Sequence, residues 1–466
     1  MRKFSLGTKV FIIYFFALTL SLISLTGFLD SHLVNFFSFI CFLLYFLYIY
    51  REKQFLFFLL LPFSFPHLTA IISNIYLDTG VYISELSLLS EATGAASRLI
   101  FFVLTMFTMA HCVFSLLYNN MAGKTCYVKL PIRRFEDKAL ILFAVIIITA
   151  LVFGLYKWGS PLSEGEQRFE YWKNHPLPWF KSLLYQTYLL GFLIGCIIIQ
   201  ATNKRILLFV LIVCLGLNVL YGEKFTGLMI TVLYFICGFI VSYYINYGIP
   251  KRLVNVKTTL LAIVAFILVF SLVYYQYKYI HNVGNNVVGY ILNRLFSLQG
   301  EVWWASDYLY FNDKLSPDSY YLFNEGASCV DYGGLYYMMR NIAPWSLVSA
   351  YCDRGVTFTM GFPAIGLATI GYANTILLSI IAGALVGLTS FLTMISIRNR
   401  NYIALFFAFK VVLIETHALN MGNMHNIFDS KFMFYLIAFI FISRIAFTYE
   451  KINSHVPASI PSGQAK

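Results

Sequence analysis

The sequence predicts an all-α polytopic membrane protein with about twelve transmembrane helices. Of its 466 residues, 59% are hydrophobic and 12% are charged, whereas a soluble domain carries roughly 25% charged residues. The apolar residues are grouped in long runs, and a helix needs about 20 such residues to cross a bilayer. These two observations exclude a soluble enzyme.

Twelve apolar runs are long enough to be spans. They cover residues 8–27, 33–50, 55–76, 99–118, 139–156, 182–200, 206–222, 226–246, 258–276, 373–396, 402–419 and 431–448. The chain therefore divides into nine spans within 1–276, a long polar loop at 277–358, three spans within 359–450 and a tail at 451–466. Glycine and proline interrupt 359–372, so we expect a short or re-entrant helix there, leading into the tenth span.

Lysine and arginine are unevenly distributed between the loops, and this bias sets the orientation. The N-terminus and every second turn are basic, as at Lys204 and Arg205, whereas the opposite loops are acidic or mixed, as at Glu85 and Glu91. We therefore place both termini in the cytoplasm and the long loop outside. The net charge of +12 follows from this bias and does not indicate nucleic acid binding.

The loop at 277–358 is the longest polar segment of the chain. Loops longer than about 15 residues are uncommon unless they are functional or disordered. This one is rich in Trp, Tyr, Phe and Leu and poor in charge, which is not the composition of a disordered segment. It predicts a folded cap over the membrane domain, where a bulky polar ligand can be held.

Cations on the outer side are candidates for binding an anion, because the orientation bias makes them scarce there. Lys224 lies in the short turn Tyr221–Gly227, whose two glycines allow a close backbone approach to a phosphate. A Glu223–Lys224 pair that closes the turn is an equal alternative. Arg168 lies in the second-largest outer loop, 157–181, where a solvated side chain is the alternative.

Four further charged residues of the loop are candidates, three of them for catalysis (Arg294, Glu301 and Arg340) and Arg354 for substrate binding. Apolar residues recur with helical spacing over 286–310, so Arg294 and Glu301 would share one face of a helix, unless this is an ordinary charged surface helix. Arg340 is surrounded by apolar and aromatic residues, and Arg354 follows Asp353, which is its alternative partner. Arginine suits bidentate phosphate binding, so converging arginines would make a diphosphate site.

Aromatic and sulfur-containing side chains of the same loop suggest two further features. Trp303 and Trp304 could stack on sugar rings, although a place in the core of the cap is at least as consistent with the sequence. Cys329 and Cys352 could form a disulfide in an oxidising compartment, or remain two buried thiols. No Cys/His cluster or DxD-type motif indicates a metal site, so we expect no metal or other cofactor.

Three local patterns resemble those of one family. The turn from Gly222 to Gly227 carries Lys224 where that family has a Gly-x-Arg turn. The string Arg294, Phe296, Glu301 resembles the start of its large loop, and GFPAIGLATIGYANTILLSIIAGALVGL at 361–388 resembles its Pro/Gly-rich approach to the next span. With about twelve spans and one large external loop before the last three, the chain resembles the Wzy-type O-antigen repeat-unit polymerases, and more distantly the O-antigen ligases.

This resemblance implies a GT-C-like, metal-independent glycosyltransferase in the bacterial inner membrane with its active site facing the periplasm. Its substrates would be undecaprenyl-diphosphate-linked glycans, and its partners a chain-length regulator and a flippase. Arg294 and Arg340 would stabilise negative charge on the leaving diphosphate, and Glu301 would deprotonate the acceptor hydroxyl. The substrate-binding residues would be Lys224, Arg354, Arg168, Trp303 and Trp304.

Two other functions remain open. A flippase for lipid-linked oligosaccharides needs polar residues deep in many spans, whereas here they are nearly confined to Lys410, Glu415 and His417 in the eleventh span. A membrane acyltransferase would need an intramembrane His/Asp pair, and the sequence offers no convincing one. Both alternatives are therefore less well supported than the polymerase.

Overall fold

The structure is a computed structural model. It describes residues 6–27, 29–121, 128–132, 136–164, 168–223, 225–248, 267, 270–271, 274–280, 286–326 and 331–449. Within these residues, eight helices are long and apolar enough to cross a membrane, which confirms an all-α, multi-pass membrane protein. They are α1 (Leu6–Thr26), α2 (Ser31–Glu52), α5 (Ala95–Met121), α6 (Glu136–Trp158), α9 (Phe180–Ile197), α11 (Phe225–Tyr247), α18 (Ala364–Arg398) and α19 (Tyr402–Met421).

Shorter elements complete the described part of the chain. The remaining helices of the membrane domain are α3 (Gln54–Leu59), α4 (Leu61–Leu77), α10 (Lys204–Leu220), α20 (His425–Phe428) and α21 (Ser430–Ile442), with α7 (Pro161–Glu164) and α8 (Arg168–Asn174) in the loop between α6 and α9. The long loop forms the π-helix η1 (Gln276–Ile280) and α13 (Val287–Phe296), α14 (Glu301–Phe311), α15 (Tyr320–Phe323), α16 (Gly334–Ile342) and α17 (Trp345–Arg354). We call α13–α17 the cap.

Two small sheets join distant or neighbouring segments. The strands β1 (Tyr82–Ile83) and β2 (Leu88–Leu89) form an antiparallel pair in which Tyr82 faces Leu89. The strands β3 (Val128–Ile132) and β4 (Ile445–Tyr449) run parallel, with Val128 opposite Ile445. The second pair ties the loop after α5 to the segment after the last helix.

The spans differ from the sequence prediction at two places. The run 55–76 forms two helices, α3 and α4, rather than one, and Pro62 stands in the first turn of α4, where a missing N–H is tolerated. The helix expected at 431–448 ends at Ile442, because the following residues enter β4. Most of 258–276 lies outside the described residues.

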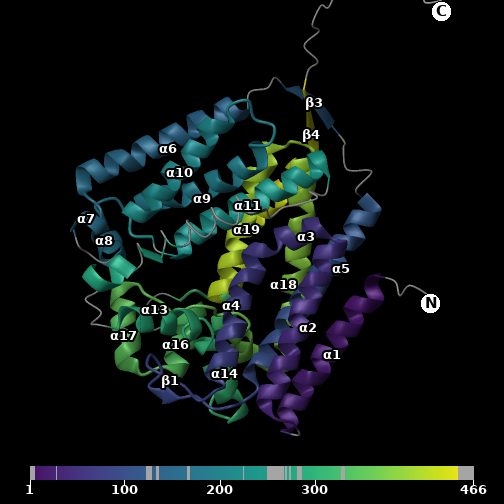
Figure 1. Cartoon of the computed structure of the whole chain (residues 1–466), viewed down its shortest axis with the longest axis vertical. Helices are drawn as coiled ribbons and strands as arrows, with labels where there is room; N and C mark the ends of the chain where they lie inside the picture. The colour runs from purple at the N-terminus through teal and green to yellow at the C-terminus, as the bar shows by residue number, and fades with distance from the viewer. Residues whose placement is uncertain are drawn as a thin grey trace, which may run out of the picture.

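The helices form two groups with α19 between them (Figure 1). One group contains α1, α2, α4, α5 and α18, and the other contains α6, α9, α10 and α11. Helix α19 contacts members of both groups, namely α4, α18 and α9. The cap lies at one end of the first group, and its helix α17 also meets α8 beside the second group.

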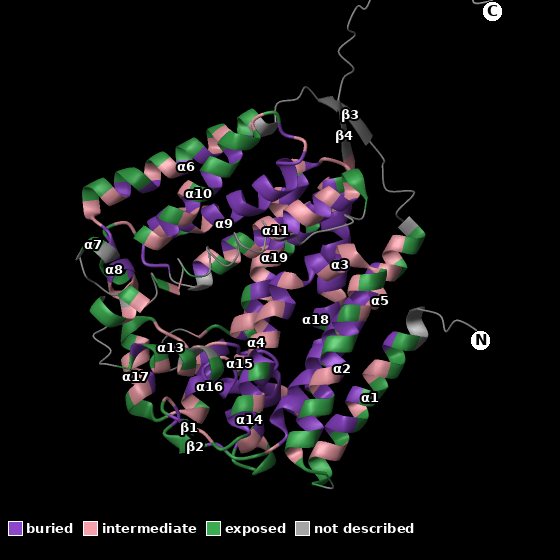
Figure 2. Cartoon of the chain, viewed as in Figure 1, coloured by how far each residue is buried: buried purple, intermediate pink, exposed green. Residues whose placement is uncertain are grey.

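Close backbone contacts explain the tight pairing of α5 with α18. Gly387 lies against α5, and a Cβ atom there would stand 2.5 Å from the carbonyl oxygen of Ala110. Gly383, one turn earlier, lies in the same way against the carbonyl oxygen of Met106. Small residues four apart allow membrane helices to approach closely. Both helices are therefore largely buried (Figure 2), whereas α6 exposes an apolar outer face that includes Ile146 and Phe153.

Helix α18 changes direction near its start. Gly371 has φ 78° and ψ 175°, which interrupts the helical conformation inside α18. The preceding residues from Ala364 to Thr369 are all buried. A short buried helix therefore precedes the long span. Just after the interruption, the backbone N–H of Tyr372 donates a hydrogen bond to the hydroxyl oxygen of Tyr310 in the cap, at 3.3 Å.

Candidate functional site

Both loop tryptophans hold the cap on the membrane domain. The Trp303 indole donates its Nε1–H to the carbonyl oxygen of Ala95 at 2.8 Å, and Trp304 donates to Oδ1 of Asp78 at 3.0 Å. The exposed fractions of the two side chains are 1% and 0%. In this conformation neither ring offers a face to a sugar, so the structure places them in the core of the cap, the alternative that the sequence left open.

A buried ion pair continues this attachment. Arg98 of α5 makes two hydrogen bonds to the carboxylate of Asp307 in α14, one of them from Nε to Oδ1 at 2.8 Å. Its other donors reach Ser24 Oγ of α1 at 3.0 Å and the carbonyl oxygen of Thr93 at 2.9 Å. Helix α14 is thereby fixed to two spans through one guanidinium.

Asp78, at the end of α4, is a second carboxylate of the same attachment. It accepts hydrogen bonds from Asn35 Nδ2 at 2.6 Å and from the backbone N–H of Gly94 at 3.0 Å, in addition to the Trp304 indole. Its relative exposure is 1%, and these donors offset the desolvation of the carboxylate. Sequence reasoning did not identify Asp78 and Asp307, or the pairing of Arg98 with Asp307, because these residues are far apart in the chain.

Arg294 and Glu301 do not lie on one continuous helix, which corrects the sequence prediction. Helix α13 ends at Phe296, and α14 begins at Glu301. Gly300, between them, lies so close to Ser73 and Asn74 of α4 that a Cβ atom would stand 2.7 Å from Ser73 Oγ. The side chain of Arg294 lies outside the described residues. Glu301 has an exposed fraction of 0%.

Arg340 lies on an aromatic pair within the cap. Its guanidinium is 4.9 Å from the ring centre of Tyr321 and 5.6 Å from that of Tyr337. These two rings are stacked, with centres 4.2 Å apart. The guanidinium is half-buried, and cation–π contacts stabilise its position while leaving donors for other groups. Arg340 therefore belongs to the cap rather than to the bundle.

A second charged site forms where α8 meets the turn between α10 and α11. Arg168 Nη1 donates to Oε2 of Glu223 at 2.5 Å. The Glu223 side chain is 6% exposed, and that of Arg168 is 24% exposed. Lys181, at the start of α9, is close enough to both to interact with them electrostatically. Glu223 thus pairs with Arg168, and Lys224, the partner considered from sequence, lies outside the described residues.

Arg354 lies on the cap side of the same region. It ends the exposed C-terminal turn of α17, and the preceding Asp353 accepts a hydrogen bond through its backbone oxygen from Lys173 Nζ of α8 at 2.6 Å. We use the term outer junction for Arg168, Lys173, Lys181, Glu223 and Arg354. These residues are four cations and one carboxylate, and Glu170 of α8 and Asp353 of α17 add two carboxylates beside them in the chain. The cations are still in excess, which suits an anionic ligand.

Aromatic rings form the inner wall of the outer junction. His175 stacks on Phe180 with ring centres 5.2 Å apart and lies 5.0 Å from Trp158. Its Nδ1 accepts the backbone N–H of Leu177 at 3.1 Å. Burial lowers the pKa of His175 below the ordinary range. The neutral ring therefore serves to pack the outer loop on α9.

Disulfide formation and metal binding were also considered from sequence. Cys352 is disulfide-bonded, and Cys329 lies outside the described residues. Five other cysteines are free thiols: Cys41, Cys112, Cys196, Cys214 and Cys237. Within the described residues, no group of three His, Cys, Asp or Glu side chains could hold a metal ion.

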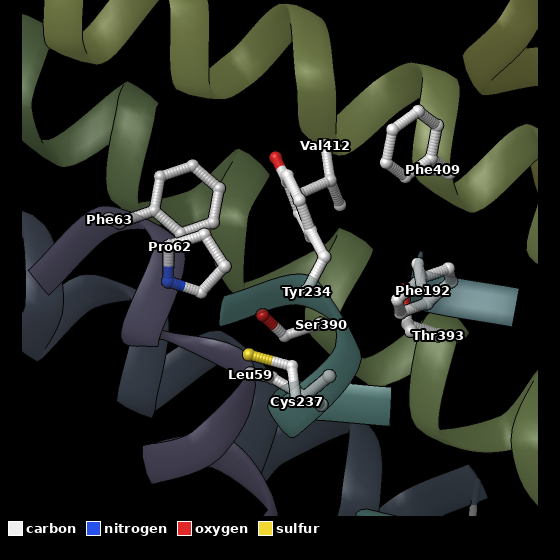
Figure 3. Close-up of a pocket in the computed structure, with 10 residues that line it drawn as sticks. All are labelled: Leu59, Pro62, Phe63, Phe192, Tyr234, Cys237, Ser390, Thr393, Phe409 and Val412. Atoms are coloured by element: carbon white, nitrogen blue, oxygen red, sulfur yellow. The ribbon is translucent and has the colours of Figure 1, made fainter. Parts of the chain in front are cut away.

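A small internal pocket lies in the middle of the bundle, away from the outer junction (Figure 3). Its volume is about 20 Å³, and Phe63, Phe192 and Phe409 supply much of its wall. Tyr234 projects into it (Figure 3), and its hydroxyl lies 3.2 Å from Oγ1 of Thr416. This space holds one water molecule at most, so it is not the place for a glycan.

The sequence candidates thus fall into two separate regions. Arg168 and Arg354 lie at the outer junction, whereas Trp303, Trp304 and Glu301 are buried in the attachment of the cap. Arg340 occupies the face of the cap that carries the Tyr321–Tyr337 pair. Lys181, at the start of α9, also belongs to the outer junction.

Comparison with known proteins gives a partial match. Residues 330–436, less than a quarter of the chain, match the model of a family of unknown function, DUF6418. The matched segment begins just before α16, contains Arg340 and Arg354, and ends within α21. No curated protein sequence and no solved structure matches the chain.

Proposed function

We propose that the chain polymerises undecaprenyl-diphosphate-linked oligosaccharide repeat units into an O-antigen-type polysaccharide at the periplasmic face of the bacterial inner membrane. The observation that supports this best is the outer junction, where Arg168 and Lys181 lie close to Glu223, and where α8 meets the end of α17 that carries Arg354. In the orientation that we propose, this site would lie at the boundary between membrane and solvent, which is where a lipid-linked sugar presents its diphosphate.

The chemistry of this transfer matches the residues of the junction. When a glycan leaves its diphosphate carrier, negative charge develops on the phosphate oxygens. Fixed cations stabilise this charge in the transition state more than in the ground state, and therefore accelerate the reaction. The Arg168–Glu223 hydrogen bond holds the guanidinium in one orientation, so little reorganisation is needed when the charge appears.

The cap supplies the second element of the proposal. Arg340 and its aromatic pair lie within the cap, and arginine and tyrosine both hydrogen-bond sugar hydroxyls, so we propose that they contact the growing glycan. Glu301 is enclosed in this conformation. If it deprotonates the acceptor hydroxyl, α13 and α14 must separate from α4 during the reaction cycle.

The test is the ladder of surface lipopolysaccharide on a gel, in a strain that lacks this chain. A polymerase defect leaves lipid A-core capped with a single repeat, because flipping and ligation continue. Complementation with the wild type should restore the ladder, and complementation with Arg168→Gln should not. Lys157→Gln is the matched control, since Lys157 is an exposed outer cation beside Trp158 and outside the junction.

Other outcomes would contradict the proposal. Loss of the single-repeat band as well would indicate the flippase. An unchanged ladder in the strain lacking the chain would exclude O-antigen polymerisation and direct attention to another glycan or to acyl transfer. A normal ladder from Arg168→Gln would remove the junction from the mechanism.

A further inference from the structure

Helices α9 and α19 bring polar side chains together inside the membrane domain. One hydrogen bond and one electrostatic interaction link the two helices, and their order along the chain is that of antiparallel helices. Lys410 Nζ of α19 donates to Oε1 of Gln186 in α9 at 3.4 Å. Further toward the outer end, His417 lies within electrostatic range of Lys181. We call Lys181, Gln186, Lys410 and His417 the α9–α19 seam.

The seam extends inward from the outer junction. Lys181 belongs to both, and Gln186 follows it by five residues, which is about 7.5 Å along a helix axis. Lys410 lies eleven residues before the outer end of α19 at Met421, or about 16 Å along the axis. Its ammonium group is therefore held below the surface of the bilayer, where a charge is costly unless a partner or a polar cavity compensates it.

The seam is open to a ligand. His417 is exposed, and Lys181, Gln186 and Lys410 are all partly exposed. Their side chains are thus not sealed in the core, although the helices that carry them are packed against each other. A molecule that approaches between the spans can reach them.

The charge of the seam is not balanced by the described residues around it. The polar contact of Lys410 is the neutral amide of Gln186, its other neighbour Phe406 is apolar, and Lys431 adds a like charge. Near Lys181 the carboxylate of Glu223 is already bonded to Arg168. The result is an excess of positive charge within a low-dielectric surrounding, where an anion is bound more strongly than in water.

We propose that the α9–α19 seam binds the phosphate group of a membrane-borne lipid, with Lys410, His417 and Lys181 as its ligands. Lysine and histidine donate charge-assisted hydrogen bonds to phosphate oxygens. A lipid is the natural carrier, because its chain stays in the bilayer while its head enters the seam between the helices. The identity of this lipid rests on the proposed function, under which it would be the diphosphate carrier of the glycan.

Binding is measured on the full chain in nanodiscs of neutral phosphatidylcholine, with decaprenyl phosphate as the probe. We expect saturable binding that Lys410→Met weakens about tenfold, since a hydrogen bond to a charged group is lost. Lys410→Arg keeps the charge and should retain most of the affinity. Lys157→Gln, an exposed outer cation outside the seam, should bind as the wild type does.

Two competitors define what is recognised. Neutral decaprenol should not displace the probe, and displacement would mean that the chain rather than the phosphate is bound. Inorganic diphosphate should compete only weakly, and equal competition would mean that the seam takes soluble phosphate. His417→Gln provides a second test, which stands alone if Lys410→Met does not fold. Unchanged binding of the probe in every variant that folds would overturn the proposal.

The assay contains no glycan, so it separates this inference from the proposed function. Normal probe binding by a chain whose deletion leaves the ladder intact would refute the polymerase and keep the seam. A lost ladder together with unaltered probe binding in Lys410→Met and His417→Gln would keep the polymerase and refute the seam.

Discussion

Replacement of Asp307 by Asn tests how firmly the cap is attached to the membrane domain. The substitution keeps the shape of the side chain and removes the charge that faces Arg98. The side chains are 4% and 0% exposed, so water cannot take the place of the carboxylate. Loss of one partner from a buried ion pair costs about 3–5 kcal/mol, and we expect Asp307→Asn to lower the free energy of unfolding by about 3 kcal/mol, because Ser24 and Thr93 still accept from the guanidinium.

The double variant Arg98→Met/Asp307→Leu is the matched comparison. Apolar side chains of similar volume often replace a buried ion pair without loss of stability. We therefore expect the double variant to be within about 1 kcal/mol of the wild type, so that the two changes are strongly non-additive.

Unfolding of the purified protein in mixed micelles gives the global free energy, and hydrogen exchange of the amides in α14 reports the local effect. Exchange in α14 should accelerate in Asp307→Asn and recover in the double variant. A cost below about 1 kcal/mol for the single variant, or simple additivity of the two changes, would refute the view that this pair fixes the cap.

Three further predictions concern other parts of the structure. Arg168→Gln should destabilise the protein by about 1–3 kcal/mol, because Glu223 remains buried without its partner. Adding Glu223→Gln should restore the melting temperature but not the lipopolysaccharide ladder. Recovery of both would argue against a catalytic role of Arg168. Folding lowers the pKa of His175, so below the ordinary value of about 6.5 the unfolded chain binds a proton that the folded chain does not. The free energy of unfolding should therefore fall as the pH drops, until the pKa of the folded state is reached. If the melting temperature of His175→Phe depends on pH as steeply as that of the wild type, this reasoning is refuted. Gly387→Leu should prevent α18 from packing on α5 near Ala110, and normal yield of folded protein would contradict that close contact.

Much of the membrane domain was predictable because hydropathy and length decide which segments enter a bilayer. The helices α1, α2, α5, α6, α9, α11 and α19 correspond to predicted spans within a few residues. The prediction was weaker where a local interruption competes with hydropathy. Pro62 lies within an apolar run that hydropathy alone treats as one span, and the residues after Ile442 pair with β3 instead of extending the helix.

The site was less predictable because its contacts join residues that are distant in the chain. Arg98 and Asp307 are 209 positions apart, and nothing in either local sequence identifies the other as its partner. A break of four residues between α13 and α14 changed the expected relation of Arg294 to Glu301, although the helical spacing on either side was present. The scarcity of lysine and arginine in the loops expected outside selected Arg168 and Arg354 without requiring their partners, and their role as site residues stays a prediction.

The two sides of the cap are attached by contacts of very different strength, and this difference bears on how a bulky substrate reaches the outer junction. Helix α14 is held by a buried bidentate ion pair and two buried indole hydrogen bonds. Helix α17 contacts α8 through an exposed hydrogen bond from Lys173 to Asp353, and exposed contacts of this kind contribute little to stability. Local opening follows the weaker contacts, so separation of α17 from α8 costs less than separation of α14 from the spans, although Tyr351 of α17 also donates a hydrogen bond to Glu85 at 3.0 Å. The contact that opens more easily is the one beside Arg168 and Lys181, and under the proposed function a lipid-linked glycan would meet these cations without disturbing the attachment of α14.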